Sequence, residues 1–441
     1  MKIFEKDKAL DSQAVRRKHG EFLFSTINYY SEPIVPVQAK GNRLTDLDGK
    51  TYLDFFGGIL TISVGHANEH VNAAIRTQIE RLGHVSTLYP TIGIVKLAET
   101  LARITPGNLR KVFFTTSGTE ADETGVMLAQ VATGNQEIIA LRHAYSGRSM
   151  LGQSLTAHAS WRPLSSQIPG IKHALAPYCY RCPLKLQPES CGVQCARDIE
   201  ELIQTTTTGQ VAGFLAEPIQ GVGGFITPPP EYFEIAVGIV RKYGGIFICD
   251  EVQTGLGRTG RKMFGIEHWG VQPDVITMAK GIANGLPLGA TIATPVVADS
   301  LKHLSLSTFG GNPISTAAAA ATLEVIEREN LPANADRMGN MLRAGLEEIQ
   351  KRCPKTIGEV RGMGLMQAIE LVEDETTGDR TPASNKALQL MEETKKRGLL
   401  IGKGGLYGNV LRIAPALNIT AGEIEEGLKI LRESFQAMRV G

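Results

Sequence analysis

Two short runs mark the centre of this chain, the first entirely apolar and the second apolar except for one threonine. Residues 246–249, Ile-Phe-Ile-Cys, follow a pair of glycines and end at an acid, Asp250. Residues 275–278 form a second run, and Lys280 follows it closely. Apolar runs without alternation are typical of parallel strands that are covered on both faces. Because open α/β sheets bind ligands at the carboxyl ends of their strands, Asp250 and Lys280 either form a salt bridge or hold opposite ends of one ligand.

From about residue 111 the hydrophobic pattern alternates between short apolar runs and longer segments with helical spacing. This alternation predicts an α/β fold with a mostly parallel sheet and right-handed crossovers. The expected strands are 112–114, 138–141, 211–216, 246–249 and 275–278, with one helix ending near 132 and another following Pro230.

The pattern changes towards the N-terminus. Residues 1–35 alternate charged and aromatic stretches and predict a helical arm, which Pro33 would end. An Asp-Gly pair at 48–49 between alternating flanks predicts a turn in a small meander. Helical segments are expected at 69–81 and 97–104.

The C-terminal part predicts helices around 315–327, 342–351 and 387–397, and then an amphipathic last helix. Thr420 and Glu423 have the spacing of a capping box at the start of that helix. Its apolar stripe consists of Ile424, Leu428, Leu431, Phe435 and Met438. The polar stretch 373–380 is expected to be an exposed loop.

Composition narrows the class of protein. The chain has 441 residues, enough for two to three domains, with 42% hydrophobic and 21% charged residues. A net charge of +1 gives no electrostatic reason to expect nucleic acid or an anionic membrane as partner. The first eight residues contain no apolar core for export, and no apolar run is long enough to span a bilayer. Six cysteines fit a reducing cytoplasm, which is the expected location.

Four of the cysteines cluster, namely Cys179, Cys182, Cys191 and Cys195. Two close pairs are able to ligate zinc as thiolates, but the loop they would close is shorter than in common zinc ribbons. A disulfide is another alternative. We favour a compact surface insertion with free thiols, so no metal ligand is assigned.

A long ordered motif surrounds the acid and the lysine. It consists of Asp-Glu-Val-Gln-Thr-Gly at 250–255, Gly-Arg-Thr-Gly at 257–260, Pro-Asp at 273–274 and Ala-Lys-Gly at 279–281. This signature resembles that of the class III aminotransferases, which are pyridoxal 5′-phosphate enzymes of fold type I. The similarity runs over about residues 30–432 and is closest to the branch of alanine–glyoxylate and ω-amino-acid aminotransferases.

The resemblance implies the architecture and the assembly. A large domain at 66–330 would contain a mostly parallel, seven-stranded sheet covered by helices. A smaller α+β domain would be built from both chain ends, 1–65 and 331–441. The family further implies a homodimer with shared active sites, or a tetramer built from it.

The resemblance also implies a ping-pong transamination. An amino group would move from an amino acid or ω-amine donor to a 2-oxo acid such as pyruvate, glyoxylate or 2-oxoglutarate. The alternative in this class is a decarboxylating lyase of the dialkylglycine decarboxylase type. Those lyases carry a glutamine in the loop before the Gly-His pair, and loop 54–61 of this chain contains none, which favours the aminotransferase.

Lys280 and Asp250 are the expected catalytic residues. An uncharged lysine amine condenses with an aldehyde and later moves protons, so its site must lower the pKa of the amine. A carboxylate at Asp250 would keep the pyridine nitrogen of the cofactor protonated. By resemblance, Val252 lies against one face of the ring and Gln253 reaches its phenolic oxygen. Taken alone, Lys280 would be interpreted as a surface lysine at a helix start, and Asp250 as a strand-end cap.

Two further segments are expected to bind the cofactor. Ser117, Gly118 and Thr119 stand at the start of a helix, where free N–H groups and the positive dipole end suit a phosphate. Tyr145 follows a strand and is able to stack on the other face of the ring. The family more often has a histidine where Ser146 stands. The alternatives are an ordinary helix start and an aromatic residue packed under a loop.

The remaining candidates concern the substrate and the partner subunit. In the family, an arginine at the position of Arg412 binds the substrate carboxylate, and a glutamate at the position of Glu217 pairs with it until a dicarboxylate arrives. Candidates for an apolar donor pocket are Tyr29, Tyr30, Phe55 and Phe56, although aromatics near the N-terminus equally often pack in a core. By resemblance, Thr308 reaches the phosphate of the neighbouring subunit; a free, glycine-rich loop is the alternative.

Overall fold

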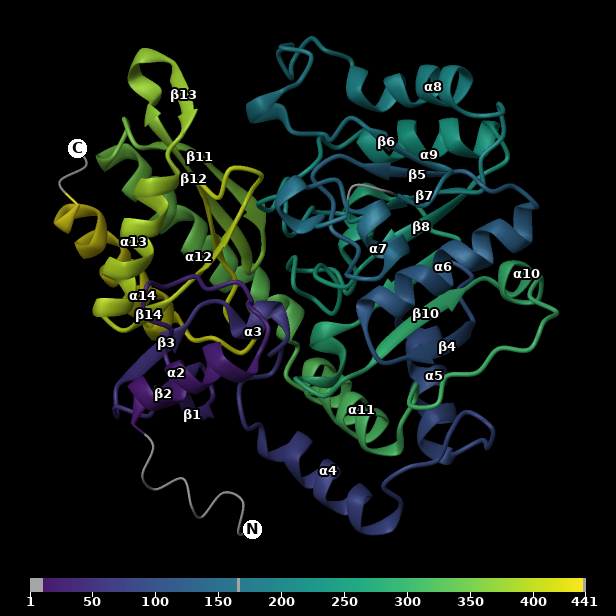
Figure 1. The fold of residues 1–441 in the computed structure, drawn as a ribbon, viewed down its shortest axis with the longest axis horizontal. Coiled ribbons are helices and arrows are strands. Elements are labelled where there is room, and N and C mark those ends of the chain that lie inside the picture. The colour runs from purple at the N-terminus through teal and green to yellow at the C-terminus, as the bar shows by residue number, and fades with distance from the viewer. Residues whose placement is uncertain (1–10, 165–166, 439–441) are drawn as a thin grey trace.

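The computed structural model describes residues 11–164 and 167–438, which form two lobes (Figure 1). A seven-stranded sheet in the order β4-β10-β9-β8-β7-β5-β6 forms the centre of the larger lobe. β10 is antiparallel to both of its neighbours, whereas the strands from β9 to β6 pair in parallel. The strands are β4 (Lys111–Thr115), β5 (Ile138–Leu141), β6 (Ile171–Ala174), β7 (Gly213–Ala216), β8 (Ile246–Asp250), β9 (Val275–Met278) and β10 (Gly289–Ala293). The prediction of a mostly parallel, seven-stranded sheet is confirmed.

The central strand β8 is covered on both faces, as its unbroken apolar run indicates. Phe247 belongs to a core cluster together with Phe233 of α9 (Tyr232–Lys242). The next residue, Ile248, belongs to a second cluster together with Val126 of α6 (Gly118–Thr133). Because side chains alternate along a strand, the two helices cover opposite faces of the sheet.

The smaller lobe is made from both ends of the chain, shown in purple and in green to yellow in Figure 1. One sheet, β1-β2-β3-β14, pairs N-terminal strands with a C-terminal strand, and a second has the order β11-β12-β16-β15, with β13 on β12. Its strands are β1 (Pro36–Lys40), β2 (Arg43–Asp46), β3 (Thr51–Asp54), β11 (Ile357–Met363), β12 (Met366–Asp374), β13 (Asp379–Pro382), β14 (Leu399–Leu400), β15 (Gly402–Gly404) and β16 (Val410–Ile413).

The other helices connect and cover these sheets. They are α2 (Ser12–Phe22), α3 (Gly57–Leu60), α4 (Glu69–Arg81), α5 (Ile92–Ile104), α7 (Met150–Leu155), α8 (Gln194–Thr206), α10 (Pro295–Ala298), α11 (Pro313–Arg328), α12 (Leu331–Arg352), α13 (Ser384–Lys396) and α14 (Ala421–Ala437). Short 3-10 turns are η2 (Ala159–Trp161), η3 (Cys179–Arg181), η4 (Gly265–Trp269), η5 (Lys280–Ala283) and η6 (Glu375–Thr377). No helix among the described residues is long and apolar enough to cross a membrane.

Several local predictions are confirmed and others need correction. Thr420 caps α14 in a capping box with Glu423, as expected. The N-terminal arm is helical only over α2, and residues 23–35 are irregular; residues 1–10 lie outside the described part. The stretch 373–380 is not simply a loop, because it completes β12, forms η6 and begins β13. Pairing of β13 with β12 satisfies backbone groups that a loop would leave to water.

Candidate active site

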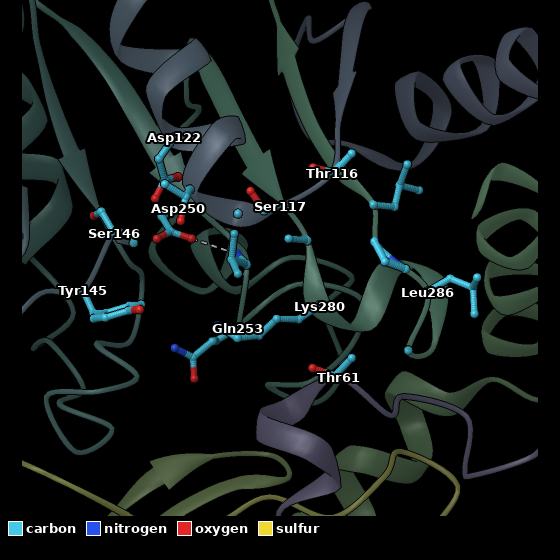
Figure 2. A pocket seen from close by; sticks show the side chains of 18 residues that line it. Thr61, Thr116, Ser117, Asp122, Tyr145, Ser146, Asp250, Gln253, Lys280 and Leu286 are labelled. Atoms are coloured by element: carbon cyan, nitrogen blue, oxygen red, sulfur yellow. Dashed lines mark hydrogen bonds between the residues drawn. The ribbon is translucent and has the colours of Figure 1, made fainter. Parts of the chain in front are cut away.

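The carboxyl ends of β4, β5, β8 and β9 lead into the same cavity, which has a volume of about 310 Å³. Figure 2 shows the side chains that line it, with Asp250, Ser117, Tyr145 and Lys280 coming from different elements. Eight of the nine residues expected to bind the cofactor line this cavity: Ser117, Gly118, Thr119, Tyr145, Asp250, Val252, Gln253 and Lys280. The sheet thus brings together residues from positions 117 to 280 of the chain.

Lys280 occupies an unusual place at the start of η5. Its φ of 44° lies in the left-handed region, which side chains other than glycine rarely adopt. Burial lowers the pKa of its amine, and the charge of Arg412 acts in the same direction, whereas Asp250 and Glu217 oppose the shift. A lowered pKa increases the fraction of uncharged amine, which is the nucleophilic form.

Two buried acids face the cavity beside the lysine. Burial raises the pKa of Asp250 to about 6, while the N–H of Val252, at 2.9 Å, and the charge of Lys280 oppose the shift. Burial and the charge of Asp250 raise the pKa of Asp122 well above its ordinary value. Both shifts show that this buried site disfavours two negative charges side by side. Asp122 also accepts a hydrogen bond from the Thr277 hydroxyl at 2.6 Å.

The start of α6 supplies an anion site at the edge of the cavity. The Ser117 side chain caps the helix by accepting the N–H of Glu120 at 3.2 Å. The first N–H groups of the helix have no partner within it, and the dipole of this 16-residue helix adds positive potential. A Cβ on Gly118 would come within 3.3 Å of Val252, so glycine allows the start of α6 to lie directly against the segment that follows β8.

Polar atoms without protein partners face the same space. The hydroxyl of Ser146 and Oε1 of Gln253 are buried and have no hydrogen-bond partner in the protein, and both residues line the cavity. Buried polar groups are normally satisfied, so these two atoms indicate a polar ligand. Tyr145 adds an aromatic ring, which packs edge-on against Trp161 at 5.3 Å between centroids.

Arg412, on β16, is buried, and its charge is one of the causes that lower the pKa of Lys280 in the cavity. Its Nε donates to the Lys403 carbonyl at 3.1 Å, Nη1 to the Gly221 carbonyl at 3.3 Å, and Nη2 to the Tyr29 hydroxyl at 3.1 Å. A guanidinium has five N–H donors, so two remain for a ligand. The group also lies over the Phe56 ring, 4.9 Å from its centroid.

Glu217 does not pair with Arg412 in this structure. Its two carboxyl oxygens accept the backbone N–H groups of Tyr145, at 3.2 Å, and of Gly221, at 2.7 Å. Burial, with the charge of Asp250, raises the pKa of Glu217 to about 8. A neutral carboxyl at Glu217 needs no counter-ion. The guanidinium of Arg412 therefore stays available for a ligand.

Two expected site residues lie elsewhere. Tyr30 donates its hydroxyl hydrogen bond to the Ile401 carbonyl at 3.3 Å and lines a different cavity, so the structure does not bring it to the site. The neighbouring Tyr29 reaches Arg412 instead. Thr308 is exposed and does not line the cavity of its own chain.

Sequence analysis missed Asp122, and it named Tyr29 only as a candidate for an apolar pocket. Asp122 is an acid on the buried face of α6, one turn after the residues expected to bind the phosphate, and a charged residue at an apolar helix position is a detectable signal. No such signal showed that Tyr29 and not Tyr30 would bond Arg412, since the two neighbours have the same side chain.

Comparison with known proteins places this geometry in context. The family model described as aminotransferase class-III matches residues 26–435. Alanine–glyoxylate aminotransferase 2 homolog 2, mitochondrial, of Arabidopsis thaliana is 42% identical over 429 residues, covering 97% of this chain and 88% of that protein. Alanine–glyoxylate aminotransferase 2, mitochondrial, of Homo sapiens is 35% identical, covering 98% and 88%. A PLP-bound amine transaminase from an uncultivated Pseudomonas species has a TM-score of 0.87 and 32% identity, covering 95% of this chain and 98% of that one.

Proposed function

This chain belongs to the class-III aminotransferases and is an enzyme that uses pyridoxal 5′-phosphate to move an amino group from an amine donor to a 2-oxo acid; from this premise we propose that its acceptor is a small 2-oxo monocarboxylate, glyoxylate or pyruvate. The relatives named alanine–glyoxylate aminotransferase support this choice. The observation that carries it is the buried guanidinium of Arg412, which keeps two unused N–H donors and whose charge acts on Lys280 in the cavity.

The cavity fits the cofactor. We propose that the start of α6, with Ser117, Gly118 and Thr119, holds the phosphate, and that Asp250 faces the ring nitrogen. Tyr145 and Val252 would cover the two faces of the ring, and the unpartnered oxygens of Ser146 and Gln253 would meet its polar atoms. When bound, the cofactor supplies an aldehyde and an electron-withdrawing ring.

The roles of the protein groups follow from their environment. Lys280, with its lowered pKa, gives and takes the proton at the reacting carbon. Asp250, with a pKa of about 6, is ionised at neutral pH and would stabilise positive charge on the ring nitrogen, while Asp122 lies beside it and helps to hold it in place. Arg412 orients the 2-oxo acid by its carboxylate, so that one group serves every acceptor of this class.

A second cavity supports a place for the donor side chain. It has a volume of about 520 Å³ and is lined in part by Tyr29, Trp161 and Val222. Trp161 contacts Tyr145, and Tyr29 bonds Arg412, so this space adjoins the site. We propose that it accepts donors of different length, including ω-amines.

The decarboxylating lyase is not favoured, since the relatives reported above are named aminotransferases.

We propose a homodimer with shared sites. Exposed apolar residues on two segments, 79–95 and 296–309, support it, because exposed apolar side chains that gather on a surface mark an interaction site. They are Ile79, Leu82, Leu88, Tyr89, Ile92, Val95, Val296, Leu304, Leu306 and Phe309. Thr308 belongs to the second segment, which supports its contact with the partner's phosphate. A tetramer would need a further interface.

We also propose the domain division 1–65, 66–330 and 331–441, which the pairing of β14 with β3 supports. A reducing compartment such as the cytoplasm is proposed because all six cysteines are free.

Replacing the arginine tests the acceptor assignment. Arg412→Ala should slow the acceptor half-reaction with glyoxylate or pyruvate roughly 10- to 150-fold, the value of a charge-assisted hydrogen bond of about 1.5–3 kcal/mol. A monoamine donor without a carboxylate should lose much less, measured by single-turnover absorbance of each half-reaction. Arg258→Ala is the matched control, because this buried guanidinium bonds only backbone carbonyls. Equal losses of rate in both half-reactions would mean that Arg412 has only a structural role and does not bind the acceptor.

A further inference from the structure

The cavity of about 520 Å³ that we propose for the donor side chain contains one ammonium group. Lys403, in the middle of β15, lines this cavity together with Gly408. A Cβ on Gly408 would lie 3.8 Å from Nζ of Lys403, so the charged end of the lysine lies beside that glycine. Among the described residues that line the cavity, none is an aspartate or a glutamate. The lining therefore carries a positive charge and no negative one.

The ammonium group of Lys403 also has no carboxylate partner elsewhere in the described part of the chain. Burial lowers the pKa of its amine, and no acidic side chain acts on it. The half-buried Lys386 of α13 differs in this respect, since its Nζ pairs with Glu373 at 3.1 Å. A half-buried charge loses part of its hydration, and an anion that entered the cavity would compensate for that loss.

A buried histidine in the same lining does not supply the missing negative charge. Burial lowers the pKa of His158 against the opposing effect of the Gly405 carbonyl, so its ring is neutral at neutral pH. Nδ1 of this ring lies 2.9 Å from the Ser160 hydroxyl. With that hydroxyl donating to Nδ1, the ring proton is on Nε2, which is buried and has no hydrogen-bond partner of good geometry among the described residues. The cavity thus offers a cation and an unused N–H donor, and both suit a carboxylate.

The backbone of Lys403 connects this cavity to the acceptor site. Its carbonyl accepts hydrogen bonds from the Tyr29 hydroxyl at 3.2 Å and from Nε of Arg412 at 3.1 Å. One residue therefore holds Arg412 by its backbone and presents a second cation in the donor cavity by its side chain. Because a backbone carbonyl does not depend on the side chain, Lys403 can be substituted while its bonds to Tyr29 and Arg412 remain.

Two cations at different places suit two carboxylates at different places on the substrates. A 2-oxo acid has its carboxylate beside the reacting carbon, where Arg412 is proposed to bind it. We propose that Lys403 binds the far carboxylate of the amine donor, and that the preferred donors are ω-amino carboxylates, with the amine at one end and the carboxylate at the other. This inference rests on the proposed function, which places the donor side chain in this cavity. A diamine would instead bring a second ammonium group towards Lys403, and like charges repel.

Three donors of equal chain length test the proposal with the holoenzyme. The compounds 5-aminopentanoate, pentylamine and 1,5-diaminopentane differ only at the far end, and their four- and three-carbon homologues cover shorter donors. Single-turnover absorbance gives the second-order rate constant of each donor half-reaction. At the length that fits best, the native enzyme should favour the amino carboxylate. Lys403→Met, which keeps the length of the side chain, should lower the ratio of the amino carboxylate rate to the alkylamine rate roughly tenfold.

Further variants separate an effect of charge from an effect on the structure. Lys403→Glu should reverse the preference, so that the diamine reacts fastest, and Lys403→Arg should keep the native preference. Lys355→Met is the matched control, at an exposed lysine of the smaller lobe outside the cavity lining, and should leave all three rates unchanged. Equal losses for all donors in Lys403→Met, or a native enzyme without preference for amino carboxylates at any length, would overturn the proposal.

Arg412 provides the competing outcome. If Arg412→Ala slowed the amino carboxylates selectively and Lys403→Met did not, the far carboxylate would bind Arg412 and the proposal would be wrong. The acceptor half-reaction of the native enzyme with glyoxylate uses no donor, so it tests the proposed function separately from the role of Lys403.

Discussion

The guanidinium of Arg412 donates from Nη2 to the hydroxyl of Tyr29 at 3.1 Å, although 383 positions separate the two residues. The same hydroxyl donates to the Lys403 carbonyl at 3.2 Å, and that carbonyl also accepts Nε of Arg412 at 3.1 Å. This closed arrangement fixes the plane of the guanidinium. Because Tyr29 lies in the N-terminal segment and Arg412 on β16, the acceptor site requires both ends of the chain to meet.

Tyr29→Phe should therefore weaken acceptor binding while leaving the fold intact. Loss of one hydrogen bond to a charged group costs about 1.5 kcal/mol, so the KM for glyoxylate or pyruvate should rise roughly tenfold, with a smaller change in kcat. Tyr30→Phe is the matched control, since its hydroxyl bonds only the backbone of Ile401. Equal effects of the two changes would show that Tyr29 does not position Arg412.

The two acids behind the cavity should respond differently to the same substitution. Asp122→Asn should keep cofactor affinity and kcat within a few-fold, because the raised pKa of Asp122 favours the protonated form, which an amide resembles, and an amide oxygen still accepts the Thr277 hydroxyl. Asp250→Asn removes the charge itself and should reduce kcat roughly 10- to 150-fold or more. Steady-state kinetics and cofactor titration of both variants provide the measurement. A large loss of activity in Asp122→Asn would contradict this assignment and would mean that Asp122 carries a required negative charge.

The sequence predicts best where local pattern and tertiary role coincide. The apolar run before Asp250 predicts a doubly covered strand because burial on both faces leaves no alternation, and helix 69–81 has the bounds that its spacing predicts. β10 was not predicted, since Gly-Ala-Thr-Ile-Ala is short and mostly small, and only its two antiparallel neighbours stabilise it as a strand. α8 was not predicted either, because its polar face conceals the three residues that it buries.

The same contrast between local sequence pattern and tertiary packing applies to the site residues. Residues next to one another in a motif were identified together, and eight of them line the cavity. Asp122 and Tyr29 act through partners 155 and 383 positions away, and no local pattern encodes such a distance. The choice between Tyr29 and Tyr30 depends on which ring the smaller lobe turns towards Arg412, and that is decided by packing.

Glu217 should make stability depend on pH. Its pKa is about 8 in the folded state and near 4.5 when unfolded, so the folded protein holds an extra proton between these values. Stability due to this group is therefore fully present below about pH 4.5 and is lost as the pH rises towards about 8. Glu217→Gln does not titrate, so the urea midpoint of the cofactor-free variant, compared with the native protein, should rise steadily over that range. A constant offset at every pH would mean that Glu217 is ionised when folded.

Mixed dimers decide whether each active site is shared. We propose that Lys280 of one subunit acts with Thr308 of the other, because Thr308 is exposed on its own chain and lies on an apolar segment. Lys280→Ala homodimers should lose borohydride-fixed cofactor, and Thr308→Ala homodimers should bind the cofactor more weakly, by about 1 kcal/mol or roughly fivefold for one lost hydrogen bond. A mixed dimer contains one Lys280→Ala subunit and one Thr308→Ala subunit. If the sites are shared, one site would contain both substitutions and the other would contain neither. Half of the sites should then bind cofactor with native affinity, measured by titration of tagged heterodimers purified on two columns. If Thr308 served its own chain, the only site with an intact lysine would carry the threonine substitution, and every remaining site would bind weakly.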